Sequence, residues 1–392
     1  MILSTSDIHT YPQRGQQFGF NALGPMRAKV EASQNMENIS SSLNVTSSSG
    51  WKTAEQCLSS METSAVRVGL YVFITVIVTA TMVGNFLVVL AVVYFKQLQS
   101  PTNAFVLSLS IADFLIGIMV MPYSMIRTIE GCWHFGSIFC QIHSSLDVML
   151  CTASILHLSC IALDRYYAVC DPLVYNCKMS PGRVTTLLLV CWMVPATISF
   201  VPIMLELHRS GIDPDLLASG SCAFMVNRAY AVCASLIAFY LPMFMMLAAY
   251  WKIYRAARKQ AMQIGAVENQ VQGYPSGLEA AHAHKQSMKR ERKAAKTLGI
   301  IIGTFLVFWL PFFTANIIDP FLGYKMDRVT WEVLVWLGYS NSSINPFLYG
   351  VLNRSFRRAF LIIISCKISV QRSSQNFHLS NSKWDAAQRS VQ

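Results

Sequence analysis

Three charged side chains stand in apolar stretches of the sequence, where a charge is costly. Asp113 and Asp147 are carboxylates, and Arg165 is a cation eighteen residues after Asp147. Because a helix turns once every 3.6 residues, this spacing places Asp147 and Arg165 on one helical face, about 27 Å apart. A charge inside a bilayer costs roughly 2.5–3.5 kcal/mol on insertion scales, so each of the three is a candidate functional residue.

Aromatic side chains recur at helical spacing in two later segments and could form the wall of a pocket. They are Phe305, Trp309 and Phe312, followed by Asn316, in one segment and Tyr339, followed by Ser342, in the next. Core packing is the ordinary explanation of such a stripe, and it is favoured for Phe305 alone. Together with Asp147, which has no evident partner, the stripe favours a pocket for an organic ammonium, held by an ion pair and by cation–π contacts.

Seven apolar segments are long enough to carry these residues across a membrane, since about 20 residues suffice. Of the 392 residues, 53% are hydrophobic and 13% are charged, whereas soluble domains carry roughly 25% charged residues. This composition disfavours a cytosolic enzyme, a disordered scaffold and a nucleic-acid-binding protein. The predicted spans are Val66–Phe95, Thr102–Arg127, Ser137–Tyr167, Val184–Leu205, Ala229–Tyr254, Leu298–Ile318 and Val329–Val351.

Lysine and arginine side chains predict the orientation of the spans. They gather between residues 252 and 296 and again between 354 and 367, whereas the opposite loops hold few. The positive-inside rule therefore places the N-terminus outside and the C-terminus in the cytoplasm. Because the net charge of +11 is explained by this sidedness, nucleic acid is excluded as a partner. Four segments are expected: an extracellular, glycosylated and disordered tail (1–65), the membrane domain (66–352), a short amphipathic cytoplasmic helix (353–366) and a cytoplasmic tail (367–392).

The predicted topology divides the eleven cysteines by compartment. Four of them, Cys57, Cys132, Cys140 and Cys222, fall outside, an even number that permits three pairings. We predict a Cys140–Cys222 disulfide between the third span and the second outer loop, and Cys57–Cys132 as a second pair.

Three further positions are candidate modification sites. Asn38 and Asn44 each begin a glycosylation sequon in the outer tail. Cys366 follows the amphipathic segment and is a candidate palmitoylation site, although an ordinary free thiol fits the sequence equally well.

A series of short motifs along the chain resembles, in the same order, the motifs of the rhodopsin-like (class A) G-protein-coupled receptors over residues 66–366. They are Gly84-Asn85, Ser108-Leu-Ser-Ile-Ala-Asp113, Asp164-Arg165-Tyr166, Trp192, Phe308-Trp309-Leu310-Pro311 and Asn345-Pro346-Phe-Leu-Tyr349. Each motif is weak alone, but their order on seven spans is specific. One departure is Phe308, where many relatives carry Cys. The resemblance implies an all-α membrane protein, a bundle of seven transmembrane helices with a short amphipathic eighth helix in the plasma membrane.

Within that family, Asp147 matches the amine-binding aspartate of the aminergic receptors, and Tyr339 matches the tyrosine that steadies it. Opsins carry their Schiff-base lysine where this chain has Tyr339, so the resemblance excludes retinal. The ligand-binding residues that it implies are Asp147, Cys151, Thr152, Ser235, Trp309, Phe312, Phe313, Asn316, Trp336 and Tyr339.

The resemblance also implies an allosteric sodium site and an activation switch, with no cofactor. The sodium site comprises Asp113, Ser154, Asn341, Ser342 and Asn345, for which a hydrogen-bonded buried acid is the alternative. The switch comprises Asp164, Arg165, Tyr166, Tyr250, Glu291, Phe305, Ile155, Pro242 and Tyr349. Arg165 is expected to pair with Asp164 and Glu291 at rest and to meet Tyr250 and the G protein when active, so that ligand biases a two-state element.

Several segments, among them Ser199-Phe-Val-Pro-Ile-Met204, resemble the type 4 subfamily of serotonin receptors. This implies serotonin as the agonist, the stimulatory G protein Gs and arrestin as partners, and contact with plasma membrane lipid. Ala234 and Ala238 stand where catecholamine receptors usually carry serines, which favours serotonin over dopamine or adrenaline. A receptor for trace amines or other monoamines is the alternative, although Asn353 replaces a tyrosine of the trace amine signature.

Two other classes of membrane protein fit the sequence less well. A secondary amine transporter should show two related halves with broken helices, and no internal repeat is apparent. An intramembrane hydrolase needs paired acids or a zinc site, and His143 and His157 lie fourteen residues apart with no evident third ligand. We therefore expect a receptor rather than an enzyme, without a metal centre, and two packed or hydrogen-bonded histidines.

Overall fold

The computed structural model describes residues 64–213, 222–271 and 277–365, without the side chains of 260–298. All of these residues belong to one compact unit, Lys52–Gln392. They form helices and connecting turns, and no strand occurs within the described ranges, as the all-α class requires. Four residues singled out above lie outside the described residues: Asn38, Asn44, Cys57 and Cys366.

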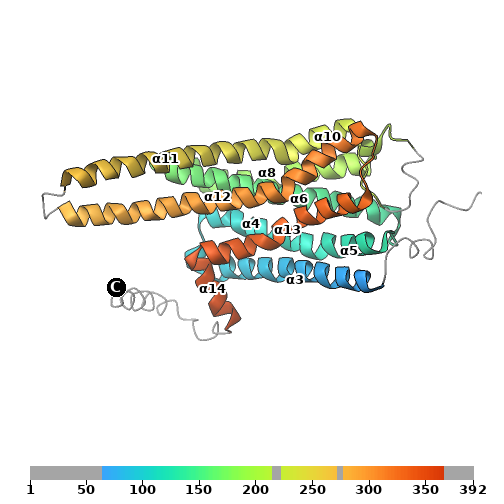
Figure 1. Ribbon diagram of the computed structural model, residues 1–392, viewed down its shortest axis with the longest axis horizontal. Helices are drawn as coiled ribbons and strands as arrows, with labels where there is room; N and C mark the ends of the chain where they lie inside the picture. The colour runs from blue at the N-terminus through green and yellow to red at the C-terminus, as the bar shows by residue number, and fades with distance from the viewer. Residues whose placement is uncertain (1–63, 214–221, 272–276, 366–392) are drawn as a thin grey trace, which may run out of the picture. The chain divides into compact units, whose positions relative to one another are not determined.

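Seven long helical rods run side by side in the described part of the chain (Figure 1). They are α3 (Ser64–Tyr94), α4 (Pro101–Leu115) with η2 (Ile116–Val120) and α5 (Met121–Glu130), α6 (Gly136–Cys170), α8 (Pro181–Met204), α10 (Arg228–Ser235) with η4 (Leu236–Tyr240) and α11 (Leu241–Val271), α12 (Gly277–Leu322) and α13 (Arg328–Leu352). The short elements are η1 (Lys96–Leu98), α7 (Tyr175–Lys178), η3 (Leu207–Arg209) and α14 (Arg354–Ile364).

Helix α6 lies at the centre of the bundle. It packs against α4, α8 and α11, while α13 packs against α3 and α12. In its most apolar stretch 67% of the residues are buried, against 22% for α8. Candidate residues on α6 therefore face other helices, whereas α8 turns most of its surface outward.

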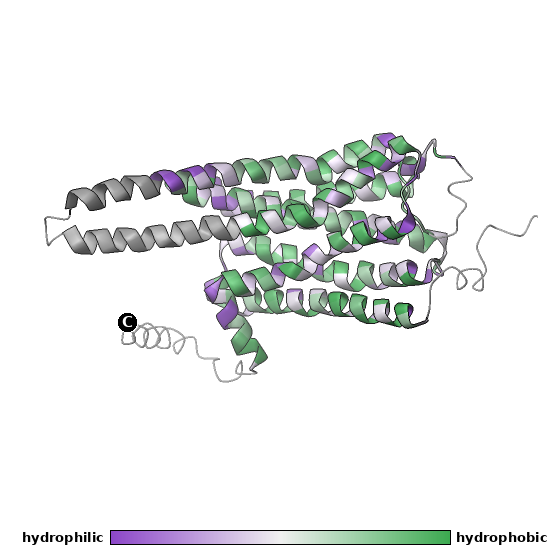
Figure 2. Ribbon diagram, viewed as in Figure 1, coloured by the Kyte–Doolittle hydropathy of each residue, from purple (hydrophilic) through white to green (hydrophobic). Residues whose placement is uncertain are grey.

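Six of the seven rods are long and apolar enough to cross a membrane, and α13 is not among them. The polar side chains of α13 lower its mean hydropathy. They are accommodated inside the bundle, because Asn341, Ser342 and Asn345 are almost completely buried while Val333 and Phe347 are exposed. The helix thus turns its polar face into the bundle and an apolar face outward, as a membrane-embedded helix does. In Figure 2 hydrophobic residues, in green, predominate along the rods of the bundle.

Two prolines inside helical rods each follow a turn of π-helix. Pro122 lies just after η2, and Pro242 lies just after η4. A proline ring clashes with the carbonyl four residues earlier and cannot bond to it. In both places that carbonyl lies inside the π turn, where the wider hydrogen-bond spacing gives room for the ring.

Side-chain caps fix the start of several helices, and one helix ends later than its predicted span. Ser100, Asn227 and Asp327 cap α4, α10 and α13 by accepting a backbone N–H from the third residue on. The sixth span was predicted to end at Ile318, before the Asp319-Pro320 pair, but α12 continues to Leu322. A proline this close to the end removes only one backbone hydrogen bond, so the last turn is retained.

Candidate ligand-binding site

A cavity lies between α6, η4, α12 and α13, toward the end of the bundle that carries the Cys140–Cys222 disulfide. It contains about 740 Å³ of space not filled by protein atoms, part of it open to solvent. Nine of the ten predicted ligand-binding residues line it, and Trp336 does not. Ala234 and Ala238, which were compared with the serines of catecholamine receptors above, line it as well. The lining residues that sequence reasoning did not place in the pocket are Arg127, Val148, Phe224, Tyr230, Trp331 and Val335.

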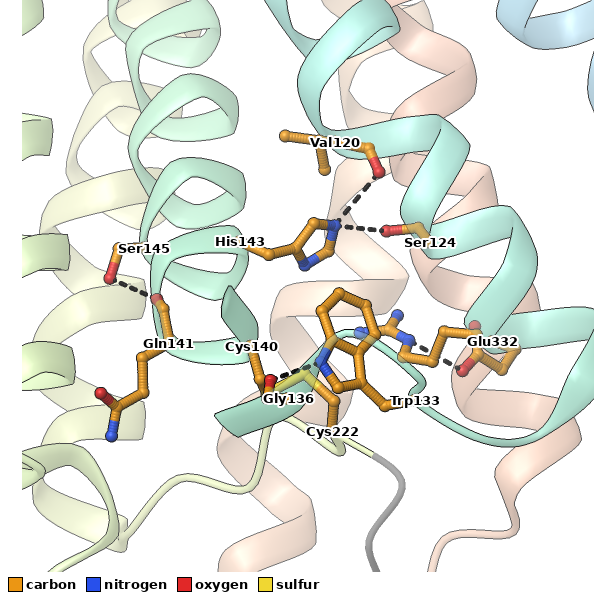
Figure 3. The surroundings of a disulfide bond; sticks show 11 residues. Val120, Ser124, Trp133, Gly136, Cys140, Gln141, His143, Ser145, Cys222 and Glu332 are labelled. Atoms are coloured by element: carbon orange, nitrogen blue, oxygen red, sulfur yellow. Dashed lines mark hydrogen bonds and ion pairs between the residues drawn. A yellow bond between two sulfur atoms is a disulfide. The ribbon is translucent and has the colours of Figure 1, made fainter. Parts of the chain in front are cut away.

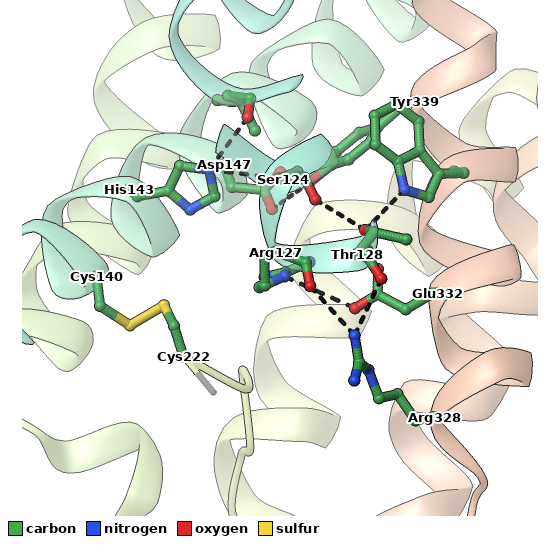
Figure 4. A network of polar contacts seen from close by, with 12 residues as sticks. Ser124, Arg127, Thr128, Cys140, His143, Asp147, Cys222, Arg328, Glu332 and Tyr339 are labelled. Atoms are coloured by element: carbon green, nitrogen blue, oxygen red, sulfur yellow. Dashed lines mark hydrogen bonds and ion pairs between the residues drawn. A yellow bond between two sulfur atoms is a disulfide. The ribbon is translucent and has the colours of Figure 1, made fainter. Parts of the chain in front are cut away.

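Asp147 presents a half-buried carboxylate to this cavity. Its Oδ2 accepts a 2.6 Å hydrogen bond from the Tyr339 hydroxyl, and its Oδ1 lies 3.4 Å from the Cys151 thiol. Among the described side chains, no Lys, Arg or His nitrogen comes within 4.0 Å of it. A carboxylate with donors but no cation can therefore attract a ligand cation (Figure 4).

A chain of hydrogen bonds supports this carboxylate from behind. The Ser124 hydroxyl lies 3.2 Å from the Tyr339 oxygen and 3.3 Å from Nε2 of His143. That nitrogen also lies 3.1 Å from the Val120 carbonyl, which can only accept, so Nε2 carries the proton. The chain fixes the Tyr339 ring and directs its hydroxyl at Asp147.

Aromatic rings form the wall opposite the carboxylate. Phe313 stacks on Phe239 with ring centroids 4.6 Å apart, and Phe312 meets Phe313 edge to face at 5.2 Å. Trp309 packs against Gly338, where an added Cβ would come within 2.7 Å of the indole ring. The absence of a side chain at 338 therefore sets where the indole lies.

Polar groups beside the aromatic wall can meet a substituent on a bound ring. The Asn316 amide donates a 3.1 Å hydrogen bond to the Ser235 hydroxyl, and both residues are buried. Because this bond occupies only an acceptor site, the Ser235 proton is free to bond elsewhere. Thr152 is also buried in the lining. The wall is thus suited to an aromatic ring with a hydroxyl group.

Trp336 belongs to a polar network next to the cavity. Its indole nitrogen donates to the Thr128 hydroxyl (3.0 Å), which in turn donates to Glu332 (2.6 Å). Glu332 is paired with Arg127 at 3.7 Å. Sequence reasoning missed Arg127 and Glu332 because both lie in the end turns of predicted spans, where a charge can reach water. Their opposite signs were the signal that could have found them.

The expected Cys140–Cys222 disulfide is present and joins the start of α6 to the segment before α10 (Figure 3). Phe224, two residues after Cys222, lines the cavity and stacks on His208 at 5.7 Å. The disulfide therefore holds in place the segment after Cys222, which we call the cover of the site. Cys132 is also disulfide-bonded; Cys57 lies outside the described residues, so that pairing stays a prediction.

The residues proposed for sodium meet around Asp113, which is completely buried. Its oxygens accept hydrogen bonds from Ser342 and Asn345, both at 2.8 Å. Ser154 Oγ and Asn341 Nδ2 are buried without a partner in the described part of the chain. An unpartnered hydroxyl oxygen beside a carboxylate suits a hard cation.

At the other end of α6, Asp164 joins three elements. It accepts hydrogen bonds from Arg165, from Thr102 on α4 (2.7 Å) and from Tyr175 on α7 (2.9 Å). Tyr166 lies under the Lys252 ammonium, 5.2 Å from its ring centroid. The Glu291 side chain lies outside the described residues, so its pairing with Arg165 remains a prediction.

The other predicted switch residues lie between these two ends. Ile155 and Phe305 are completely buried in one core cluster, and the Phe305 ring lies 5.4 Å from Phe239. Pro242 is buried after η4. Tyr349 has a buried hydroxyl with no partner in the described residues, and Tyr250 packs against Gly299. Both histidines bond to the rod made of α4, η2 and α5, His143 as given above and His157 to Ser108 at 2.7 Å.

Residues 84–349 match the seven-transmembrane receptors of the rhodopsin family. The chain belongs to this family. It is 45% identical over 315 residues to the 5-hydroxytryptamine receptor 4 of Homo sapiens, covering 77% of this chain and 81% of that receptor. It is 42% identical over 323 residues to the trace amine-associated receptor 1 of Macaca mulatta, covering 81% and 94%, and 42% identical over 300 residues to the trace amine-associated receptor 4 of Rattus norvegicus, covering 76% and 85%.

Membership of the rhodopsin family fixes the general nature of this protein. It is a G-protein-coupled receptor of the aminergic class and not an enzyme. It is a multi-pass protein of the plasma membrane that binds a small molecule and couples to a G protein. The cavity beside Asp147 has a lining and a carboxylate that suit such a ligand.

Proposed function

We propose that this receptor is activated by a biogenic amine, serotonin in the first place, that binds at Asp147. One observation carries the proposal: the Asp147 carboxylate faces an aromatic cavity and has no cation partner among the described residues. The ligand ammonium replaces that missing cation. A buried charged hydrogen bond of this kind is stronger than a neutral one and fixes the end of the ligand.

The indole of serotonin fits the opposite wall in this proposal. Its ring lies among Phe312, Phe313 and Trp309, and its hydroxyl meets Ser235. Ala234 and Ala238 line the cavity without a hydroxyl of their own, so a catechol finds fewer hydrogen-bond partners. The likeness to the human 5-hydroxytryptamine receptor 4 supports the same assignment.

A trace amine is the second candidate ligand, because the trace amine-associated receptor 1 of Macaca mulatta aligns over 94% of its length. A phenolic amine such as tyramine also presents an ammonium and a ring hydroxyl. It is smaller than serotonin, however, and leaves part of the aromatic wall without contact. The two ligands are therefore expected to differ in potency rather than in binding mode.

Signal transfer in this proposal follows α6 and α12 toward Arg165. Ligand contact with Trp309 repacks Phe305 against Phe239 and Ile155 next to the π turn η4. At the far end, Arg165 leaves Asp164 and Glu291, meets Tyr250 and binds the G protein, for which we propose Gs. Tyr166, Pro242 and Tyr349 take part in this two-state change, which the ligand biases by binding one state better.

Sodium binding at Asp113 is a further part of the proposal. Ser154 would supply an unpartnered oxygen, with Asn341, Ser342 and Asn345 around it. A bound sodium ion neutralises the Asp113 charge, so the chain alone must satisfy this carboxylate when the ion is absent. Its present hydrogen bonds from Ser342 and Asn345 do so.

The disulfide end of the bundle is proposed to face outward. Disulfides persist in oxidising compartments, and the opposite end carries the lysines and arginines expected in the cytoplasm. Glycosylation at Asn38 and Asn44, palmitoylation at Cys366 and arrestin binding at the cytoplasmic end complete the proposal.

A cAMP assay in transfected cells tests the proposed function. Serotonin, tryptamine, tyramine, phenethylamine and dopamine are compared at matched surface expression. We expect serotonin to raise cAMP at the lowest concentration. Greater potency of tyramine or phenethylamine would establish the trace amine alternative, and uptake of amine without a G-protein response would indicate a transporter.

A further inference from the structure

Two free cysteines lie between the packed helices α6 and α8, away from the amine site (Figure 1). Cys160 belongs to α6 and Cys191 to α8, and their Sγ atoms are 3.5 Å apart. Both side chains are buried, at 7% and 1% exposure. Among the free cysteines of the described residues, these are the two whose sulfur atoms the fold brings together, and we call them the thiol pair.

A hydroxyl bridge beside the thiol pair holds the helices in register. The Ser108 hydroxyl on α4 lies 2.7 Å from Nε2 of His157 and accepts a 2.9 Å hydrogen bond from the Trp192 indole. His157 lies three residues before Cys160, and Trp192 directly follows Cys191. The bridge therefore ties α4, α6 and α8 together within one turn of the two sulfur atoms, so the thiols stay opposite each other.

The polar groups of this bridge have partners of their own. Nδ1 of His157 lies 2.6 Å from the Ala153 carbonyl, which can only accept, so Nδ1 carries the proton and Nε2 accepts from Ser108. The Ser108 oxygen in turn accepts from the indole N–H of Trp192. In the described bundle, the hydrogen-bonding partner of each thiol of the pair is the other thiol.

The thiol pair lies deep in the membrane-spanning part of the bundle. Cys191 follows the first residue of α8, Pro181, by ten residues, which is about 15 Å along the helix. Glutathione and thioredoxin keep thiols reduced in the cytosol, but both are water-soluble. An apolar oxidant dissolved in the lipid reaches α8 more readily than these reductants do, because α8 turns most of its surface outward.

We propose that Cys160 and Cys191 are a modification site, at which an organic hydroperoxide of the membrane lipid oxidises the two thiols to a disulfide between α6 and α8. The Cys160 thiol, which is the more exposed, attacks the terminal peroxide oxygen. The O–O bond breaks, the thiol proton passes to the leaving alkoxide, and a sulfenic acid and an alcohol form. The Cys191 thiol then attacks the sulfenic sulfur, which forms the S–S bond and releases water. Two thiols and one hydroperoxide thus give one disulfide, one alcohol and one water.

The new bond would restrain α6 near its Arg165 end. Disulfide sulfurs are about 2.05 Å apart, so the two sulfurs must approach by only roughly 1.5 Å. Cys160 lies five residues before Arg165, about 7.5 Å along the helix, whereas Asp147 is thirteen residues away, about 20 Å. The disulfide therefore fixes α6 to α8 without reaching the amine cavity.

Peptide mapping of the full-length receptor in membranes tests the proposal. The membranes are treated with cumene hydroperoxide, denatured with excess N-ethylmaleimide and digested without reductant by chymotrypsin, which can cut after Leu158 and so separates Cys160 from Cys151. We expect the Cys160 and Cys191 peptides to be joined, two hydrogens lighter than their sum, and to separate with dithiothreitol. Cys151, which is buried beside a carboxylate instead of a thiol, is the internal control and should remain alkylated.

The variant for this test is Cys191→Ser, which removes the second thiol. We expect the sulfenic acid at Cys160 to persist in this variant and to be labelled by dimedone, whereas the wild type is not labelled there. Cys233→Ser, which removes an exposed thiol on α10, is the matched control and should keep the linkage. Oxidation should raise the melting temperature of the wild type in detergent by about 3 °C or more and leave that of Cys191→Ser unchanged.

Three results would overturn the proposal. One is a treated wild type whose Cys160 and Cys191 peptides are both alkylated or oxidised singly, a result that needs no variant. Another is a disulfide from either cysteine to a different cysteine. The third is the same change of melting temperature in the wild type and in Cys191→Ser, which would assign the effect of the peroxide to another part of the chain.

Discussion

At the scale of single residues, the site depends on how Asp147 is prepared for a cation. The Tyr339 hydroxyl and the Cys151 thiol direct their protons at the carboxylate, so it stays in place without a counter-ion. The chain through Ser124 to His143 fixes the tyrosine in turn. Removing one link should therefore weaken ligand binding without removing the charge that attracts the ligand.

Tyr339→Phe tests this link. The variant loses a hydrogen bond to a charged group, worth about 1.5–3 kcal/mol, and part of it is replaced by the ligand ammonium. We expect serotonin affinity to fall about tenfold in a saturation-binding assay, with normal surface expression. An affinity equal to that of the wild type would show that the tyrosine does not support the carboxylate.

Gly338→Ala tests the placement of Trp309. The new Cβ would come within 2.7 Å of the indole, which must move into the cavity and reduce the space for the ligand. We expect at least a tenfold loss of affinity. Gly303→Ala on α12 is the matched control, since its Cβ would meet nothing within 4 Å. Equal effects of the two substitutions would contradict the account.

Residue types and spacing alone predicted much of the site. Asp147 and the aromatic stripe could be found because a charge and a helical period are visible in one sequence. The supporting chain could not, because Ser124 and His143 meet Tyr339 from two other helices, and the sequence does not show how helices rotate about their axes. The Arg127–Glu332 pair joins residues 205 positions apart, and it was missed because both residues lie in end turns of predicted spans, where a charge can reach water.

At the scale of helices, local signals determine where most of the rods begin and bend. Proline and the capping residues act within one turn, so Ser100-Pro101 and Ser180-Pro181 indicate breaks between spans in the sequence alone, and in the structure a helix begins at each of these prolines. The π turns η2 and η4 could not be predicted, because a proline can also be accommodated by a simple kink. Asp319-Pro320 shows the converse, a proline inside the last turn of a helix.

Substitutions at Asn227 test whether the cap of α10 also holds the neighbouring loop at the disulfide end. Its Oδ1 accepts from the Tyr230 backbone, while its Nδ2 donates to the carbonyls of Leu207 and Ser210. Asn227→Ala should lower the free energy of unfolding by about 1–2 kcal/mol, measured as a lower melting temperature in detergent. Asn227→Asp keeps the cap and loses only the donors, so it should lie between. If both Asn227→Ala and Asn227→Asp were as stable as the wild type, Asn227 would not have this capping role.

At the scale of the whole molecule, the described chain is a bundle with the proposed ligand site toward one end and the proposed G-protein site at the other. Helix α6 connects them, with Asp147 near the disulfide and Arg165 near the opposite end. The membrane class and the order of the spans followed from composition and hydropathy. The seventh helix was predicted in the same way, as Val329–Val351, and the structure has it as Arg328–Leu352, although its polar residues keep its hydropathy low.

The Cys140–Cys222 disulfide closes a loop between positions 82 residues apart. Replacing both cysteines by serine should cost up to about 4 kcal/mol of stability in the chain-entropy account. It should also weaken serotonin binding, because Phe224 loses its tether. Thermal stability and binding of the double variant are the measurements, and unchanged values for both would contradict the role given to the disulfide.

A non-reducing peptide map that left Cys57 and Cys132 both open to alkylation would exclude the second pair.

The central claim is that the Asp147 carboxylate binds the ligand ammonium, and Asp147→Asn tests it most directly. The amide keeps the shape and a hydrogen-bond acceptor but carries no charge. Saturation binding of labelled serotonin is compared between wild type and variant at equal surface expression. We predict that specific binding is lost in the variant, whereas serotonin affinity within threefold of the wild type would contradict the account.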